Sequence, residues 1–258
     1  MRHLLKPAAL IGLALLLAGG QAAAIDSGSP DGDGHPFVGW MYGETPTGAQ
    51  TVGCSVLLVA PTIAITSGAC TDIFSQASNV ASVWVTFEPA NLVPFPIDPP
   101  TSPPSVEVVQ LVTDPDYLSS GGVSGNVGVL VLDEAQPGPY ATLPAAGRLD
   151  ALDGSEAYTA VAYGTERHQT IETLERRYSG ATLRGVGPDN LFLRLTKKGH
   201  GPAACAGSQA EGGGGFIGES EAVALVLDES WRCSRNVTLQ RLDVQDVRDF
   251  LGDYVTLP

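Results

Sequence analysis

Basic side chains are scarce in this sequence, and so are patterns that ligate metals. It has 14 Lys and Arg against 28 Asp and Glu, a formal net charge of −14 at pH 7. A surface this acidic repels phosphate backbones and anionic lipids, so we expect neither nucleic acid nor membrane partners. No histidine or second cysteine lies at ligand spacing from any cysteine, which argues against a metal site. No phosphate-binding glycine motif is present, and no cofactor is expected.

Long apolar runs are also missing, apart from one at the N-terminus. Arg2 and Lys6 precede the run ALIGLALLLAG, and the small residues QAAA follow it, which is typical of a secretory signal peptide. The run is too short to span a bilayer comfortably. We therefore expect a signal peptide over residues 1–24 and a secreted mature chain, extracellular or periplasmic, that begins at Ile25.

Short apolar or alternating runs make up most of the mature sequence. Clusters of Gly, Pro, Asn, Asp and Ser separate them, a pattern that predicts an all-β sandwich or barrel. The expected strands lie at residues 37–43, 51–60, 62–66, 82–88, 105–112, 127–132, 157–164, 191–195, 222–228 and 237–242. The Pro-rich segment 88–105 is predicted to be a surface excursion, and 135–156 a crossing between two halves. The glycine run 212–215 is predicted to be a loop that is flexible unless something orders it.

Only the C-terminal end shows a helical period. In RLDVQDVRDFLGDYV, Asp243 can cap the start of a helix. The apolar residues that recur on one face are Val244, Val247, Phe250 and Leu251. This pattern predicts a packed C-terminal helix.

The four cysteines predict two disulfides, because the chain is expected to be exported. Four cysteines can pair in three ways, and proximity in the sequence favours Cys54–Cys70 and Cys205–Cys233. Each bridge would stabilise the fold by roughly 3–4 kcal/mol through the loop that it closes.

Five stretches of the mature chain together carry a family resemblance: HPFVGWM at 35–41, the cysteine-bounded segment 54–70, NVGVLVLD at 126–133, AYTAVAYGT at 157–165, and the C-terminal RLD…FLGDYVTLP. In this order they resemble a bacterial secreted trypsin-like serine protease of the chymotrypsin fold (peptidase family S1). The resemblance covers nearly the whole mature chain, 25–258. It implies an all-β fold of two six-stranded antiparallel β-barrels, over about 25–135 and about 136–242, with an active-site cleft between them and a C-terminal α-helix over 243–255.

The residues that carry catalysis in this family are replaced here. The family's histidine precedes a cysteine in a TAxHC-like stretch, where this chain has Ala69. Its aspartate opens a D-[IV]-[AG]-[LV] strand, where this chain has Asn126. Its nucleophile lies in C-x-G-D-S-G-G-P, and the matching CAGSQAEGGGG places Ser208 at the aspartate and Gln209 at the serine.

These replacements remove the chemistry that the motifs would supply. Gln209 has no hydroxyl to attack with, Ala69 cannot accept a proton, and Asn126 has no charge to stabilise an imidazolium. The letters QAE also replace SGG, where backbone amides would form the oxyanion hole. Ser208 offers no counter-charge to a buried N-terminal ammonium, so we expect that Ile25 does not insert into the fold.

The sequence therefore favours a secreted pseudoprotease that binds peptide or protein segments, protease inhibitors among them, or that regulates an active relative. The alternative is an active serine endopeptidase or hydrolase with a displaced nucleophile such as Ser208, for which His200 is the candidate base. His35 and His168 are expected to be ordinary loop residues. A third alternative is a structural secreted domain that binds nothing in the cleft.

Overall fold

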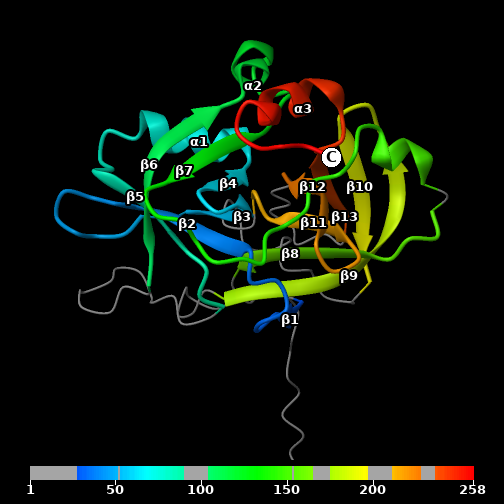
Figure 1. Ribbon diagram of the computed structural model, residues 1–258, viewed down its shortest axis with the longest axis horizontal. Helices are drawn as coiled ribbons and strands as arrows, with labels where there is room; N and C mark the ends of the chain where they lie inside the picture. The colour runs from blue at the N-terminus through cyan, green and yellow to red at the C-terminus, as the bar shows by residue number, and fades with distance from the viewer. Residues whose placement is uncertain are drawn as a thin grey trace, which may run out of the picture.

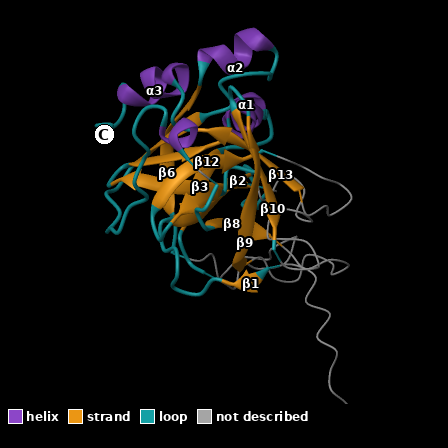
Figure 2. Ribbon diagram, turned by 90° about the vertical axis from the view of Figure 1, so that its right-hand side faces the viewer, coloured by secondary structure: helices purple, strands orange, loops and turns teal. Residues whose placement is uncertain are grey.

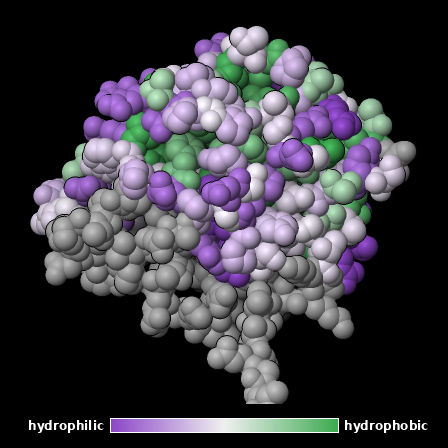
Figure 3. All heavy atoms as spheres, turned by 60° about the horizontal axis from the view of Figure 1, so that its bottom comes forward, coloured by the Kyte–Doolittle hydropathy of each residue, from purple (hydrophilic) through white to green (hydrophobic). Residues whose placement is uncertain are grey.

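The computed structural model describes residues 28–51, 53–89, 104–152, 154–164, 175–196, 211–227 and 236–258. Strands dominate these residues, and their α-helices gather toward one side of the molecule (Figure 1, Figure 2). Hydrophilic and hydrophobic side chains are interspersed on the face that Figure 3 shows. Within the described ranges, no helix is both long and apolar enough to cross a membrane.

The N-terminal half of the chain forms a closed barrel of antiparallel strands in the order β2-β3-β4-β7-β6-β5. Its strands are β2 (Val38–Glu44), β3 (Cys54–Ala60), β4 (Ile63–Thr66), β5 (Ser82–Thr86), β6 (Val106–Thr113) and β7 (Gly128–Leu132). β2 and β3 are buried along most of their length, because the second half of the chain packs against them through β8.

The C-terminal half forms a second barrel in the order β9-β10-β13-β12-β11-β8, which closes through pairing of β8 with β9. Its strands are β8 (Tyr158–Gly164), β9 (Glu175–Val186), β10 (Asn190–Leu195), β11 (Gly214–Ile217), β12 (Glu221–Val226) and β13 (Asn236–Arg241). The short strand β1 (Ser29–Pro30) adds to the edge of β9. Two six-stranded antiparallel barrels confirm the predicted fold class.

Three strands, β1, β9 and β11, lie outside the predicted segments. β9 reads ERRYSGATLRGV and has no apolar run. Its arginines Arg176 and Arg177 are nevertheless almost fully buried, because both find partners in the folded chain.

The glycine run at 212–215 is buried, and Gly214 and Gly215 belong to strand β11, which corrects the prediction of a loop there. A Cβ atom added at Gly213 would lie 2.5 Å from Cβ of Ala162. One added at Gly214 would lie 2.3 Å from the ring of Phe216. The glycines are therefore present because neighbouring atoms approach the backbone too closely for any side chain.

The structure has two α-helices and a short 3-10 helix that the sequence analysis does not predict. α1 (Gly68–Gln76) follows β4, and α2 (Pro115–Ser120) follows β6. The 3-10 helix η1 (Arg148–Ala151) lies in the crossing between the barrels. Ser67 caps α1 by accepting a hydrogen bond from the Cys70 amide at 3.1 Å. Asp114 caps α2 by accepting one from the Asp116 amide at 2.9 Å.

The C-terminal helix is present as predicted, but its cap is different. α3 spans Gln245–Gly252 and buries Val247 and Leu251. Val244 occupies the cap position and makes no side-chain cap hydrogen bond. The Asp243 carboxylate instead accepts from the amide of Leu149 at 2.7 Å and from the guanidinium of Arg241, so it joins the helix to η1 and β13.

Two apolar clusters form the core. The first fills the N-terminal barrel and continues across the barrel interface to Tyr163, Phe216 and Leu225, as well as to α3. The second lies within the C-terminal barrel around Leu193 and Leu239. Each fully buried side chain of this size contributes roughly 1.5–3 kcal/mol.

A buried arginine joins the two barrels and the N-terminal segment. Arg176, on β9, is 1% exposed, and its Nε donates to Asp31 at 2.9 Å. Its Nη1 donates to the carbonyl oxygens of Val38 at 3.0 Å and Phe87 at 3.1 Å, which both belong to the N-terminal barrel. Its Nη2 donates to the carbonyl oxygen of Gly32. One side chain of the second barrel therefore satisfies backbone acceptors of the first.

The Asp31 carboxylate is held by more than Arg176. It also accepts from the His35 amide at 2.8 Å and lies 2.7 Å from Nδ1 of the same histidine. Burial alone would raise the pKa of Asp31, but the hydrogen bonds and charge of His35, together with Arg176, outweigh it and hold the pKa below its ordinary value. The carboxylate is therefore ionised in the folded chain at neutral pH.

Candidate functional site

The end of β4 and the start of α1 place Ala69 at the junction of the two barrels. The Cys54–Cys70 disulfide fixes this turn, with an S–S distance of 1.97 Å and a Cα–Cα distance of 6.4 Å, and confirms the first predicted bridge. Ser67, fully buried, uses its hydroxyl as the α1 cap rather than as a nucleophile. Ala69 itself is half-buried and offers only a methyl group.

The structure brings Ala69 and Asn126 together although 57 residues separate them. The Ala69 amide donates to Oδ1 of Asn126 at 3.0 Å. The two residues that the sequence analysis aligns with the family's histidine and aspartate are thus adjacent. Asn126 acts here as an acceptor that holds the first turn of α1.

The second barrel supports Asn126 through a glutamine that the sequence analysis does not identify. Oε1 of Gln240, on β13, accepts from the Asn126 amide at 3.1 Å. Nε2 of Gln240 donates to the carbonyl oxygens of Asp189 at 3.0 Å and Arg241 at 3.2 Å. A polar residue at a buried position of the apolar run VTLQRL is the sequence signal that points to it.

Glu211 and Gly212, which follow the position that the sequence motif aligns with the nucleophile, pack closely against the first barrel. The Ser55 amide donates to the carbonyl oxygen of Glu211 at 2.9 Å. Gly212 has a φ of +82°, and a Cβ there would lie 2.0 Å from Oγ1 of Thr66. Glu211 is only 6% exposed, so a carboxylate is buried where the family motif has a glycine.

Tyr117, on α2, lies over the start of α1. A Cβ at Gly68 would lie 3.0 Å from Cγ of the tyrosine ring. Burial raises the pKa of the Tyr117 phenol, and the carboxylates of Glu211 and Asp72 raise it further. The phenol therefore stays protonated at neutral pH and is no general base there.

The remaining candidate residues fall into two groups. His35 is described, and its ring packs against Phe37 and Phe216 while Nδ1 contacts Asp31, so it is a structural residue of the N-terminal segment. The others lie outside the described residues: Ile25, His168, His200, Cys205, Ser208, Gln209 and Cys233.

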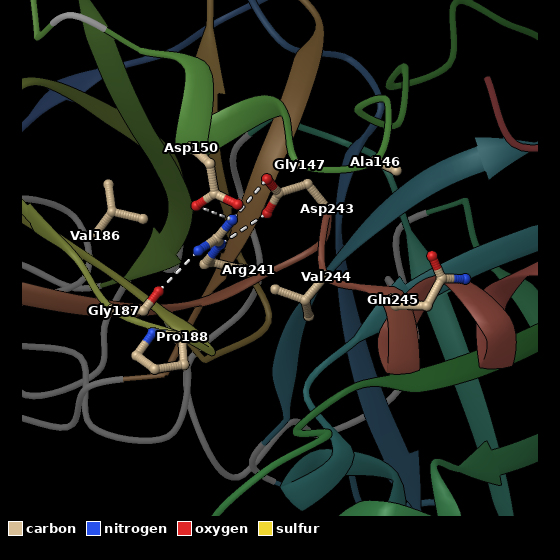
Figure 4. A pocket seen from close by; sticks show the side chains of 10 residues that line it. All are labelled: Ala146, Gly147, Asp150, Val186, Gly187, Pro188, Arg241, Asp243, Val244 and Gln245. Carbon is tan, nitrogen blue, oxygen red and sulfur yellow. Dashed lines mark hydrogen bonds and ion pairs between the residues drawn. The ribbon is translucent and has the colours of Figure 1, made fainter.

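A cavity of about 520 Å³ lies beside the start of α3, and Ala69 is not among the residues that line it (Figure 4). Arg241 is one of the residues that line this cavity. Its guanidinium donates to both carboxylate oxygens of Asp243 at 2.9 Å, to Asp150 at 2.9 Å and to the carbonyl oxygen of Gly187 at 2.8 Å. Hydrogen bonds to Asp243, which outweigh burial, raise the pKa of Arg241. The guanidinium is engaged on three sides, so we assign it a structural role. In the described part of the chain, no three His, Cys, Asp or Glu side chains converge to hold a metal ion.

Solved structures similar to this chain are trypsin-like serine proteases. A structure of HL collagenase matches 88% of this chain and 96% of its own with a TM-score of 0.62 and 13% identity. The granzyme GrC matches 87% and 95% with a TM-score of 0.63 and 14% identity. A Glu endopeptidase matches 85% and 90% with a TM-score of 0.60 and 11% identity.

No protein-family model and no curated protein matches the sequence. At the identities of the structural matches, the likeness shows the fold alone, and it spans nearly the full length of both partners in each comparison. Two six-stranded barrels and a C-terminal helix thus give this chain the chymotrypsin fold that those trypsin-like serine proteases share.

Proposed function

We propose that this protein is a secreted, catalytically inactive trypsin-like domain, of bacterial type, that binds peptide or protein segments in the cleft between its barrels. The observation that carries the proposal is the hydrogen bond between the Ala69 amide and Oδ1 of Asn126. It supports the proposal because it joins the two positions that the sequence motifs align with the family's histidine and aspartate, and neither side chain is a base or carries a charge. A hydroxyl nucleophile needs such a base, because the neutral hydroxyl attacks poorly.

The structural contacts around Ala69 and Asn126 are present, which favours a binding role over loss of all function. The disulfide, the Asn126–Gln240 contact and the pressed Glu211–Gly212 segment hold both walls in place. Extended segments of peptides, or inhibitor loops that resemble substrates, are the ligands that such a cleft fits. Regulation of an active relative would follow from competition for the same segments.

Labelling with a fluorophosphonate tests the absence of catalysis. The intact mass of the purified mature protein should stay unchanged, while an active trypsin-like protease treated alongside gains one adduct. A stoichiometric adduct would refute the proposal and favour the alternative of an active hydrolase with a displaced nucleophile, with Ser208 mapped first. The same spectrum reports whether the chain begins at Ile25.

Peptide capture tests the binding role. Peptides selected from a displayed random library on the wild-type protein should lose affinity for Ala69→Trp, whose indole would occupy the space beside Asn126. Ala135→Trp is the matched control, because Ala135 is exposed in the crossing between the barrels. Peptides that bind both variants equally well would place binding elsewhere, and selection of no peptide at all would favour a structural domain.

A further inference from the structure

Charge is divided very unevenly along this chain. Between Ile25 and Gly147 the sequence has 12 Asp and Glu and no Lys or Arg. All 12 basic residues of the mature chain lie from Arg148 onward, together with 16 acidic residues. The N-terminal half therefore carries a net charge of −12 and the C-terminal half −4. A single-sign field of this kind attracts cationic partners and speeds their approach.

The negative half meets the C-terminal helix at a surface that we term the helical crest. It consists of α1, α2 with the loop to Ser124, and α3, which lie on the same side of the molecule (Figure 1, Figure 2). The ring of Tyr117 on α2 covers Gly68 of α1. The charge of Asp246 on α3 reaches Asp114, the cap of α2, where burial is the larger cause of a raised pKa.

The carboxylates of the helical crest have no ionic partners among the described residues. Asp116 and Asp246 are exposed and form no ion pair. Asp72 and Asp249 accept only from neutral amides four residues away on their own helices, at 2.6 Å each. No cation among the described residues therefore compensates these four charges.

The one basic residue of the crest helices is turned away from the surface. Arg248, on α3, is 9% exposed and donates to the carbonyl oxygens of Pro144 and Pro258. Its guanidinium thus fastens the helix to the crossing segment and to the last residue, and it does not offset the exposed carboxylates.

Large apolar side chains are exposed among these charges. Ile73 on α1 is 60% exposed, Leu118 on α2 is 55% exposed, and Val123 in the following loop is 77% exposed. Single exposed apolar residues are ordinary, but three of them on one side of the molecule (Figure 1), on segments that also carry uncompensated carboxylates, are typical of an interaction site.

We propose that the helical crest docks a basic, amphipathic segment of a partner protein, separate from the cleft at Ala69. The apolar residues of that segment would cover Ile73, Leu118 and Val123, and its Lys or Arg side chains would meet the crest carboxylates. Phosphate-bearing partners are repelled by the same field.

Fluorescence anisotropy with a labelled helical peptide of leucine and lysine tests this docking, with the matching leucine and glutamate peptide as the negative probe. The crest variant combines Asp116→Asn, Leu118→Ser and Asp246→Asn. The control combines Asp133→Asn, Glu134→Gln and Val186→Ser, which removes the same charge and one exposed apolar side chain. Asp133 and Glu134 follow the far end of β7, the strand that begins two residues after Asn126 at Gly128. Circular dichroism establishes that both variants are folded.

We expect the lysine peptide to bind the wild-type protein, and its dissociation constant to rise at least about tenfold in the crest variant but less than about twofold in the control. Affinity should fall as salt rises from about 50 mM to about 300 mM, because the pairs are exposed. Equal loss in the two variants, equal binding of the glutamate peptide, or no binding at low salt would each overturn the proposal. None of these results bears on the cleft, whose peptides are tested through Ala69.

Discussion

Replacing Arg176 by methionine removes the guanidinium that links the two barrels while keeping an unbranched apolar stem. The substitution leaves the Asp31 carboxylate, which is 2% exposed, without the Arg176 cation. It also removes the hydrogen-bond donor of the carbonyl oxygens of Val38 and Phe87. Removal of one partner of a buried ion pair costs about 3–5 kcal/mol. At roughly 2–4 °C per kcal/mol for a chain of this size, the melting temperature should fall by at least about 6 °C.

Unfolding in guanidinium chloride, followed by tryptophan fluorescence and circular dichroism, measures this cost. Arg177→Met is the matched control, because the Arg177 side chain is also buried, at 3% exposed. The side chain of its partner Glu175 is 25% exposed, so water can solvate that carboxylate once the arginine is gone. We expect the control to lose about 1–2 kcal/mol. The double variant Arg176→Met with Asp31→Leu should recover part of the loss, because no buried charge then lacks a partner.

Two results would refute this reasoning. One is a loss below about 1 kcal/mol for Arg176→Met, which would mean that the guanidinium is not needed in the buried site. The other is a double variant as unstable as the single one. The pH dependence is a further check: because the pKa of Asp31 lies below its ordinary 3.8, the contribution of the pair is fully present above pH 3.8 and is lost as the pH falls through the lower folded value.

Three further outcomes are expected. Gly212→Ala should prevent accumulation of folded protein because of its 2.0 Å approach to Thr66, whereas Gly154→Ala, with the same φ of +82° and nothing within 4 Å, should cost only about 1 kcal/mol in denaturant unfolding. Burial, with a smaller effect of Glu156, raises the pKa of Tyr158 to about 12, so stability should decline between pH 10 and pH 12, and Tyr158→Phe should remove that decline. Asn126→Ala should lower the free energy of unfolding by about 1–2 kcal/mol through the unpaired Ala69 amide, and an unchanged free energy would show that water replaces the bond.

Strands with local apolar patterning could be predicted from the sequence. The runs at 62–66 and 127–132 correspond to β4 and β7, because alternating or continuous apolar residues report burial directly. β9 could not be predicted this way. Its buried arginine is stabilised by Asp31, 145 residues earlier in the chain, and no local pattern carries that information.

The candidate site was predictable only where a motif surrounds it. A cysteine after Ala69 and the run VGVLVL after Asn126 mark both positions in the sequence. Gln240 belongs to the other barrel, and its contact with the Asn126 amide depends on how the barrels meet. The sequence predicts a loop where Gly214 and Gly215 begin β11, because composition shows the freedom of a glycine and not the neighbours that require it.

The position of Arg176 also makes the first barrel depend on a residue that is synthesised much later. All six strands of the N-terminal barrel end by Leu132. The Asp31 carboxylate and the carbonyl oxygens of Val38 and Phe87 nevertheless accept hydrogen bonds from Arg176, which lies on β9. Bringing Arg176 to Asp31 closes a loop of 145 residues, which costs about 4 kcal/mol in chain entropy. A chain that has emerged only as far as the first barrel leaves these acceptors to water, and their native donor becomes available only once β9 has been synthesised. The first barrel alone therefore lacks the contacts of Arg176 that the complete fold provides.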